Sequence, residues 1–202
     1  MDKQMAAEWL KRFAETVEKN KEELTKLDQA VGDGDHGINM NRGLQEVLRK
    51  MEEVPADSPG GVVKAAAMIC ISKVGGASGP LYGSALMKIA SALGDEEDVE
   101  GKQLTKALRD GVDAIKKRGR AEEGEKTMVD VWEPAVQALE QGSSWQELTE
   151  IVKKARDNTI DMKATKGRAA YLGDRSIGHL DPGAVSSSYF FLELACVMEE
   201  SS

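Results

Sequence analysis

The chain has 202 residues, which is enough for one domain of ordinary size, and no stretch of the sequence marks a linker between two domains. Hydrophobic residues make up 41% of the chain, charged residues make up 31%, and the formal net charge is -8. An excess of acidic groups argues against binding to phosphate backbones and anionic lipids, so we expect neither nucleic acid nor a membrane as a partner. We expect a single domain over residues 1–202.

The start of the chain gives no sign of export. The segment DKQMAAEWLKRF is charged and amphipathic, and no apolar run is long enough to span a bilayer, which predicts a cytoplasmic protein. Cys70 and Cys196 lie in the apolar helical contexts AAMICIS and LELACVME. These contexts favour buried free thiols over a disulfide or a metal site.

Apolar residues recur at helical spacing along almost the whole chain, and alternating strand patterns are hard to find. Turn clusters break the sequence at intervals suited to helices of roughly 12 to 20 residues. We therefore predict an all-α fold. The predicted helices cover residues 4–19, 21–31, 38–52, 60–73, 79–93, 101–118, 129–141, 145–165 and 182–199.

Helix start signals and loop composition add detail to this prediction. The start signals are Ser58 before Pro59, Ser144 with Glu147 as a capping box, and Asp181 before Pro182. Four loops are rich in glycine and in polar or charged residues: VGDGDHG, KVGGASGPLYG, KRGRAEEGEKTM and KATKGRAAYLGDRSIGHLDPG. Because binding and catalytic residues concentrate in loops, we expect the functional site there.

The first of these loops, within VGDGDHGINMN at residues 31–41, carries the glycine spacing G-x-G-x-x-G. A dinucleotide-binding site would need a strand before the glycines, whereas the preceding KEELTKLDQAV is helical, so we exclude it. An EF-hand is excluded as well, because the twelfth position counted from Asp33 is Leu44 and not glutamate.

The same loop crowds three carboxylates, Asp28, Asp33 and Asp35, into eight residues. Three such groups repel one another, and divalent cations with a preference for hard oxygen ligands offset that repulsion. We therefore expect these aspartates to bind Mg²⁺, and the free N–H groups at residues 37–39 to suit phosphate oxygens. The alternative is a solvated turn in which Asp and Gly only supply backbone freedom.

The other loops leave alternatives open. In KVGGASGPLYG, small residues ahead of a helix that Pro80 can begin suit either a phosphate or a tight helix-helix turn. GRAEEGEKTM nearly matches a P-loop, but Glu125 interrupts the motif and no strand precedes it, so a P-loop is excluded. A nucleotide-covering loop with Met128 or Leu81 against the base stays possible, beside ordinary core packing. In the last loop we interpret His179 as structural.

Taken together, four segments resemble the nucleotide-binding subunit family of dihydroxyacetone kinases. They are LDQAVGDGDHGINMNRG, SKVGGASGPLYG, KRGRAEEGEKTMVDVWEP and KGRAAYLGDRSIGHLDPGA, and they follow the family order from residue 27 to 184. The resemblance implies an antiparallel barrel of eight helices, with ADP and two Mg²⁺ ions bound in loops at one end. One of the nine predicted helices is then a loop or half of a split helix, and we expect this of residues 21–31.

The resemblance also implies a set of site residues. It places Asp28, Asp33 and Asp35 on the family's magnesium ligands. It places twelve residues at the nucleotide: His36, Gly37, Ile38, Asn39, Ala77, Ser78, Gly119, Met128, Arg175, Asp181, Pro182 and Gly183. One small departure is Gly34, where a family member can carry Ala; this adds backbone freedom.

ATP-dependent family members fuse this kind of nucleotide-binding domain to a substrate domain, for which the chain has no room. The chain therefore resembles the separate subunit of the phosphoenolpyruvate-dependent system, in which ADP is a coenzyme. A phosphohistidine on a carrier subunit phosphorylates the ADP, and the γ-phosphoryl group passes to dihydroxyacetone on a kinase partner subunit, while magnesium neutralises charge. The alternatives are another acceptor, such as another ketose or a fatty acid, or a non-enzymatic calcium-binding or adaptor module.

Overall fold

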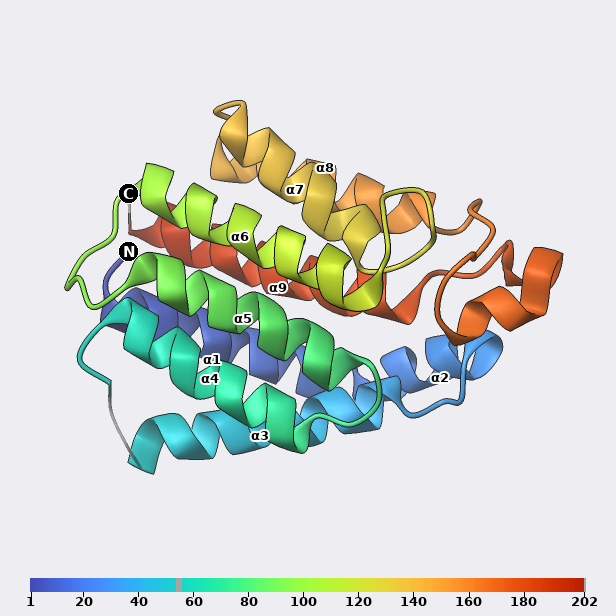
Figure 1. Cartoon of the computed structure of the whole chain (residues 1–202), viewed down its shortest axis with the longest axis horizontal. Helices are drawn as coiled ribbons and strands as arrows, with labels where there is room; N and C mark the ends of the chain where they lie inside the picture. Colours follow the sequence, from blue (N-terminus) through green and yellow to red (C-terminus); the bar gives the residue numbers. More distant parts are fainter. Residues whose placement is uncertain (54–55, 202) are drawn as a thin grey trace.

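The structure is a computed structural model that describes residues 1–53 and 56–201. Its described residues form nine α-helices and one 3-10 helix (Figure 1). These are α1 (Lys3–Lys19), α2 (Lys21–Val31), α3 (His36–Glu53), α4 (Pro59–Lys73), α5 (Ser78–Leu93), α6 (Gly101–Gly119), α7 (Val129–Glu140), α8 (Trp145–Asn158), η1 (Arg168–Ser176) and α9 (Pro182–Glu200). Within these two ranges no strand is formed, and one isolated bridge joins Asp2 to Asp98. The predicted all-α class is confirmed.

Eight of the described helices close into a ring. Helix α1 packs on α3, and the contacts then run in order through α4, α5, α6, α7, α8 and α9, which packs back on α1. Helix α2 stands outside this ring at one end, where it contacts α3, α9 and η1 (Figure 1). The eight-helix barrel implied by the resemblance is confirmed.

The helix at residues 21–31 is the extra element of that barrel. It is α2, separated from α1 by Asn20 alone, and the N–H of Leu24 donates to the Asn20 carbonyl. A side-chain hydrogen bond from Asn20 Nδ2 to the Thr16 carbonyl, 2.8 Å long, marks the break. Of the two alternatives for residues 21–31, a loop is therefore wrong, and α1 and α2 are the two halves of a split helix.

The other predicted helix limits agree with the structure to within two residues, with one exception. The helix predicted at residues 145–165 ends at Asn158. Beyond it the carbonyl groups of Thr159 and Ile160 accept hydrogen bonds from the ammonium group of Lys126. A side chain from a distant segment thus lies at the helix end, which no local pattern indicates. The 3-10 helix η1 lies where the sequence predicts a loop.

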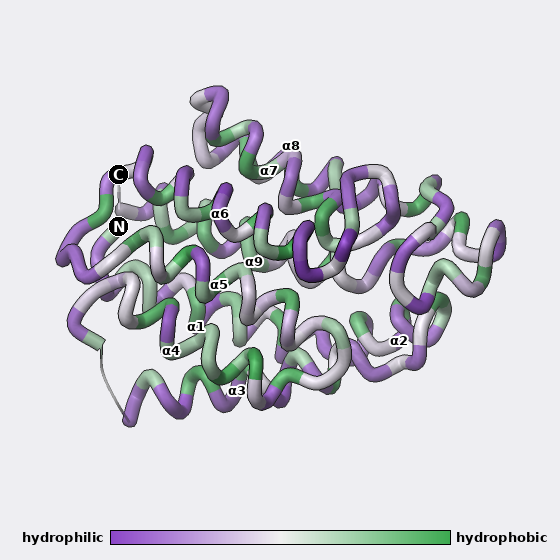
Figure 2. Tube along the Cα trace, in the orientation of Figure 1, coloured by the Kyte–Doolittle hydropathy of each residue, from purple (hydrophilic) through white to green (hydrophobic). Residues whose placement is uncertain are grey.

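An aromatic cluster fills the barrel around Phe190 of α9. The ring centroid of Phe190 lies 4.6 Å from that of Trp9, 4.8 Å from that of Trp132 and 5.4 Å from that of Phe13. The indole N–H of Trp9 donates to the Phe190 carbonyl at 2.9 Å, so this buried polar group is satisfied. Along α3 and α6, hydrophilic and hydrophobic residues alternate at helical spacing, as expected for helices with one buried face (Figure 2).

The antiparallel order of the ring brings alternate loops to the same end. The loops after α2, α4, α6 and α8 lie at the end that carries α2 (Figure 1). These loops contain the four polar, glycine-rich segments of the sequence. The barrel therefore gathers residues from across the sequence at one end. Among the described helices, none combines the length and apolar character that crossing a membrane requires.

The two cysteines are free, as predicted, but they differ in burial. Cys70 is buried, and burial raises the pKa of its thiol to about 12. Cys196 is half-buried instead of buried, because its sulfur lies at the barrel surface, 3.2 Å from Nη1 of Arg12. The prediction of burial is thus wrong for Cys196.

Replacing Phe190 with alanine tests the central role of the aromatic cluster. The Phe190 side chain is fully buried, so we expect Phe190→Ala to lower the free energy of unfolding by about 3–5 kcal/mol. Urea denaturation followed by circular dichroism measures this loss. The matched control is Tyr171→Ala in η1, where 90% of the residue is exposed and we expect a change within roughly 0.5 kcal/mol. Equal effects of the two substitutions would contradict the assignment of the core.

Candidate functional site

An open cavity lies among the loops at the α2 end of the barrel. Its lining comes from five segments that are far apart in the sequence. They are residues 28–36, residues 75–82, residues 126–128, residues 166–169 and residues 181–183. Each of the first three loops singled out in the sequence contributes to one of these segments, and the last loop contributes to two, residues 166–169 and residues 181–183. The cavity is therefore the place where chemistry distributed along the chain comes together.

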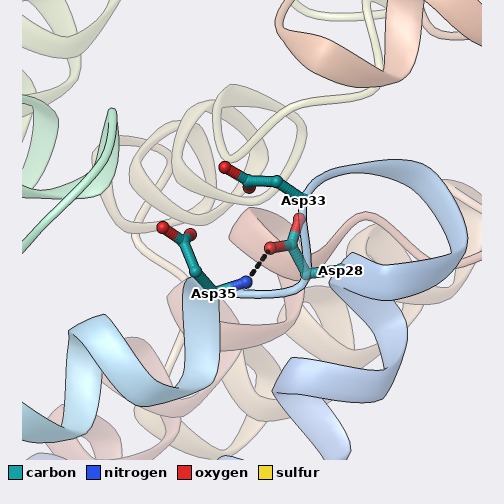
Figure 3. Close-up of side chains that lie close together, drawn as sticks. All are labelled: Asp28, Asp33 and Asp35. Atoms are coloured by element: carbon teal, nitrogen blue, oxygen red, sulfur yellow. Dashed lines mark hydrogen bonds between the residues drawn. The ribbon is translucent and has the colours of Figure 1, made fainter.

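Three carboxylates form one wall of this cavity. Asp28 lies on the last turn of α2, whereas Asp33 and Asp35 lie on the loop that leads into α3 (Figure 3). One oxygen atom from each side chain lies within 4.8 Å of the others, and no other such group of three occurs among the described residues. The set consists of oxygen atoms alone, which suits Mg²⁺ or Ca²⁺ better than Zn²⁺. The predicted convergence of these residues is observed.

Hydrogen bonds to Asp28 hold this loop in place. Its Oδ2 atom accepts the backbone N–H groups of Asp35 at 2.8 Å and His36 at 3.1 Å (Figure 3). Asp28 therefore caps the start of α3 from a different helix, in addition to facing the cavity. A Cβ atom at Gly32 would lie 2.1 Å from Asp28 Oδ1, and Gly34 has a φ of 76°. Glycine at both positions lets the carboxylates approach one another without strain.

Arg168, at the start of η1, forms an ion pair with the acidic wall. Its Nη2 atom lies 2.9 Å from Oδ2 of Asp33. The arginine side chain is 69% exposed, so solvent weakens this pair and the guanidinium is free to rearrange. Lys166 lies on the same rim of the cavity. These two cations provide positive charge beside the three carboxylates, and sequence analysis missed both.

The imidazole of His36 connects three segments of the cavity wall. Its Nδ1 lies 2.9 Å from Ser78 Oγ at the start of α5, and its Nε2 lies 3.0 Å from Ser186 Oγ in α9. Burial lowers the pKa of His36 to about 4, so the ring is neutral near pH 7. Both ring nitrogens are thus engaged. His36 braces the site and has no free nitrogen to offer a ligand.

Asp181 begins α9 as predicted. Its Oδ2 atom accepts the backbone N–H of Ala184 at 2.7 Å, which is the expected N-cap interaction. The residue is 9% exposed, lies in the cavity wall, and burial raises the pKa of its carboxyl to about 7. Both oxygen atoms are therefore held in a region of low polarity. This carboxylate differs from those of Asp28, Asp33 and Asp35, which are set around an opening.

Most of the predicted site residues line the cavity. These are Asp28, Asp33, Asp35, His36, Ala77, Ser78, Met128, Asp181, Pro182 and Gly183. The five others predicted at the nucleotide, which are Gly37, Ile38, Asn39, Gly119 and Arg175, do not line it. Their contact with a ligand stays a prediction.

The positions of these five residues have separate physical reasons. Gly37 packs against α2, where an added Cβ would lie 2.0 Å from the Lys21 carbonyl oxygen. Ile38 faces outward and is 58% exposed, while Asn39 Oδ1 accepts a hydrogen bond from Arg42.

The last two lie near the rim. A Cβ on Gly119, at the end of α6, would lie 3.3 Å from Cδ2 of Leu81, which itself lines the cavity. Arg175 lies near the end of η1 with an exposed side chain, and Arg168 at the start of η1 lines the cavity in its place. Sequence order alone could not decide which arginine of this segment faces inward.

The buried residues Asp181 and His36 have opposite effects on the pH dependence of stability. The pKa of Asp181 is raised from 3.8, so the folded state holds more protons and stability falls as pH rises towards 7. The pKa of His36 is lowered from 6.5, so the unfolded state holds more protons and stability rises from pH 4 to 6.5. Between pH about 4 and 6.5 the two effects therefore oppose one another.

The variant Asp181→Asn removes one of these effects and keeps a capping oxygen. In the nucleotide-free protein, we expect the unfolding free energy to rise with pH more steeply than in the unmodified protein. Between pH about 4.5 and about 6.5, the slopes of unfolding free energy against pH should differ between the two proteins by at most about 1.4 kcal/mol per pH unit. Urea denaturation at several pH values measures it. The control Asp174→Asn, at an exposed carboxyl whose pKa Lys163 lowers, should leave the slope unchanged. Identical slopes for all three proteins would contradict the burial of Asp181.

Comparison with known proteins agrees with this geometry. The sequence matches the DAK2 domain family over residues 30–196. A Listeria innocua protein named PEP-dependent dihydroxyacetone kinase 1, ADP-binding subunit DhaL, is 54% identical over 192 residues, which are 94% of each chain. The Escherichia coli PEP-dependent dihydroxyacetone kinase, ADP-binding subunit DhaL, is 41% identical over 200 residues, which are 95% of each chain.

A solved structure shares the fold. It is the dihydroxyacetone kinase of C. freundii in complex with AMP-PNP and Mg²⁺, which matches with a TM-score of 0.76 and 22% identity. The match covers 100% of this chain and 34% of that larger chain. The family match spans most of the sequence and includes the loops that form the cavity. The chain therefore belongs to the DAK2 domain family.

Proposed function

We propose that this chain is the ADP-binding subunit of a phosphoenolpyruvate-dependent dihydroxyacetone kinase, with residues 1–202 as one nucleotide-binding domain. The observation that carries the proposal is the convergence of the acidic wall, the small residues of the α4–α5 loop and the Asp181–Gly183 turn on one cavity. The names of relatives that match more than nine-tenths of the chain support it. One large hydrophobic core, beside a small second cluster of Val31, Ala164 and Ala169, supports a single domain.

In this proposal two Mg²⁺ ions accompany the nucleotide, and Asp28, Asp33 and Asp35 hold them. Magnesium would supply positive charge between these carboxylates and the phosphate oxygens. Asp28 is already fixed by two backbone N–H groups, so its second oxygen is oriented before an ion arrives. The loop glycines let the two other carboxylates approach. This arrangement lowers the cost of assembling like charges when the nucleotide binds.

The phosphates of ADP would bind between the start of α5 and the magnesium held by the acidic wall. Free N–H groups at a helix N-terminus favour anions, and Ala77 and Ser78 leave room for a close approach at the start of α5. Arg168 and Lys166 also line the cavity, where they can contact phosphate oxygens. Leu81 and Met128 give the cavity an apolar part suited to a base. The nucleotide would thus lie across the opening.

We further propose that the phosphoryl group arrives from a phosphohistidine on a carrier subunit and leaves to dihydroxyacetone on a partner kinase subunit. Bound ADP then acts as a coenzyme that shuttles between these two steps. Among the described residues that line the cavity, His36 carries the one imidazole, and both its nitrogens are engaged. A base for the acceptor hydroxyl would therefore come from the partner. The role of this chain is to bind and orient the nucleotide.

The variant Asp33→Ala tests the metal assignment. Removing this carboxylate takes away part of the oxygen set that offsets phosphate charge, so we expect the purified variant to retain no ADP. Release by denaturation and chromatography measures the retained nucleotide, and calorimetry with Mg²⁺ and ADP measures the remaining affinity. The matched control is Asp95→Ala, an exposed carboxylate at the opposite end of the barrel, which should retain ADP normally. Stoichiometric ADP in the Asp33→Ala protein would overturn the assignment.

A further inference from the structure

Lys126 lies in the cavity wall, yet its ammonium group contacts backbone carbonyl groups of the protein. The residue is 1% exposed, and a φ of 60° at its backbone turns the side chain inward. Its Nζ atom lies 2.5 Å from the Thr159 carbonyl oxygen, 2.5 Å from that of His179, 3.1 Å from that of Met162 and 3.4 Å from that of Ile160. Four backbone carbonyl groups therefore surround one ammonium group.

These carbonyl groups belong to parts of the chain with no hydrogen-bonded ladder of their own. Thr159 and Ile160 follow the last residue of α8, where the helix dipole is negative, and their carbonyl groups also accept the N–H groups of Met162 at 3.4 Å and Gly178 at 2.8 Å. Met162 lies in the next loop, and His179 lies two residues before Asp181. The ammonium group thus joins the end of one helix to the entrance of another.

The carbonyl groups of Thr159, Ile160, Met162 and His179 form a cage that resembles the site of a small monovalent cation. An ammonium group has three N–H donors, so four carbonyl groups share them, and no carboxylate of the described residues forms an ion pair with it. Rings of backbone carbonyl dipoles also replace water around alkali cations. Lys126 interacts with Asp181, Asp161 and Asp130 only at longer range. The four carbonyl oxygen atoms are therefore the nearest partners of this charge.

The same contacts fasten the α6–α7 loop to the rest of the site. Asp130 accepts the N–H groups of Gly124 at 2.5 Å and Thr127 at 2.7 Å, which fixes the loop from its own side. Lys126 then ties this loop to the chain that leads into α9. Its neighbours Thr127 and Met128 line the cavity, as does the Asp181–Gly183 turn.

We propose that Lys126 is a positioning residue of the nucleotide site, in which its ammonium group serves as a tethered monovalent cation that holds the end of α8, the following loop and the entrance of α9 together. This inference rests on the proposed function for the identity of the ligand. In a true P-loop the motif lysine contacts phosphate, but Glu125 interrupts that motif here. The four carbonyl contacts assign it a different role, because they occupy all three donors of the ammonium group.

The variant Lys126→Met removes the ammonium charge and keeps most of the length of the unbranched side chain. Methionine fills the path of the aliphatic chain and ends before the ammonium position, so the cage is left open for a free cation of similar size. Nucleotide-free protein is titrated with ADP and Mg²⁺ in chloride buffers of equal ionic strength that contain tetramethylammonium, potassium or ammonium. The unmodified protein should bind ADP equally in all three. The variant should bind at least about tenfold more weakly in tetramethylammonium and recover in potassium or ammonium, since about 1.4 kcal/mol separates each tenfold step.

The matched control is Lys166→Met, which removes a half-buried lysine from the lining of the same cavity, where its Nζ lies 3.8 Å from Glu125 Oε1. Its ammonium group has no carbonyl cage, so its ADP affinity should be the same in the three salts, whatever its absolute value. Recovery specific to potassium or ammonium in Lys126→Met would then report the cage and not general salt screening. Undiminished affinity of Lys126→Met in tetramethylammonium would overturn the proposal. A folded variant that binds weakly and recovers in neither cation would also overturn it.

Two readouts do not depend on ADP. The thermal midpoint of nucleotide-free Lys126→Met should be higher in potassium or ammonium than in tetramethylammonium, while that of the unmodified protein should not change. If no ADP binds to the unmodified protein, the proposed function fails, and this midpoint still tests the cage. If the variant does not fold, nitrogen-15 NMR of the unmodified protein tests whether the Lys126 ammonium group is held in the cage. A lysine ammonium signal that exchanges slowly with water near pH 7 supports the cage, and its absence refutes it.

Discussion

Repulsion among three carboxylates is the constraint around which the α2 end of the barrel is built. Asp28, Asp33 and Asp35 bring oxygen atoms within 4.8 Å of one another, an arrangement that is costly unless positive charge offsets it. The structure offers partial compensation through the N–H groups of the α3 start and through Arg168. A bound divalent cation would complete it. In the proposed function, an acidic loop that is unsuited to phosphate by itself would become a phosphate site in the presence of magnesium.

The barrel makes this possible because antiparallel helices return alternate loops to the same end. Buried polar contacts then fix those loops relative to one another. His36 joins the starts of α3 and α5 to α9, and Lys126 joins the α6–α7 loop to the end of α8 and the approach to α9. Each buried group is satisfied by several partners, as burial of polar atoms requires. The rim cations Arg168 and Lys166 remain outside this rigid set, where they can respond to a ligand.

The sequence predicted the helices well because apolar periodicity and caps such as Ser58 and Asp181 are local signals. It also predicted the three aspartates, because their crowding is visible in eight residues. It failed where distant contacts decide the outcome. The early end of α8 depends on Lys126, which lies 33 residues before Thr159 in the sequence. Sequence analysis missed Arg168, whose place in the cavity wall depends on how η1 folds, and the 3-10 geometry of η1 has no clear periodic signature.

The central claim is that the acidic end of this barrel holds ADP through magnesium. Analysis of what the protein carries tests it most directly. The protein is purified without added nucleotide and denatured, and the released nucleotide and metal are measured by chromatography and mass spectrometry. The account predicts ADP in nearly equimolar amount together with magnesium. Release of no nucleotide, or of calcium without nucleotide, would contradict it and favour a structural role for the acidic loop.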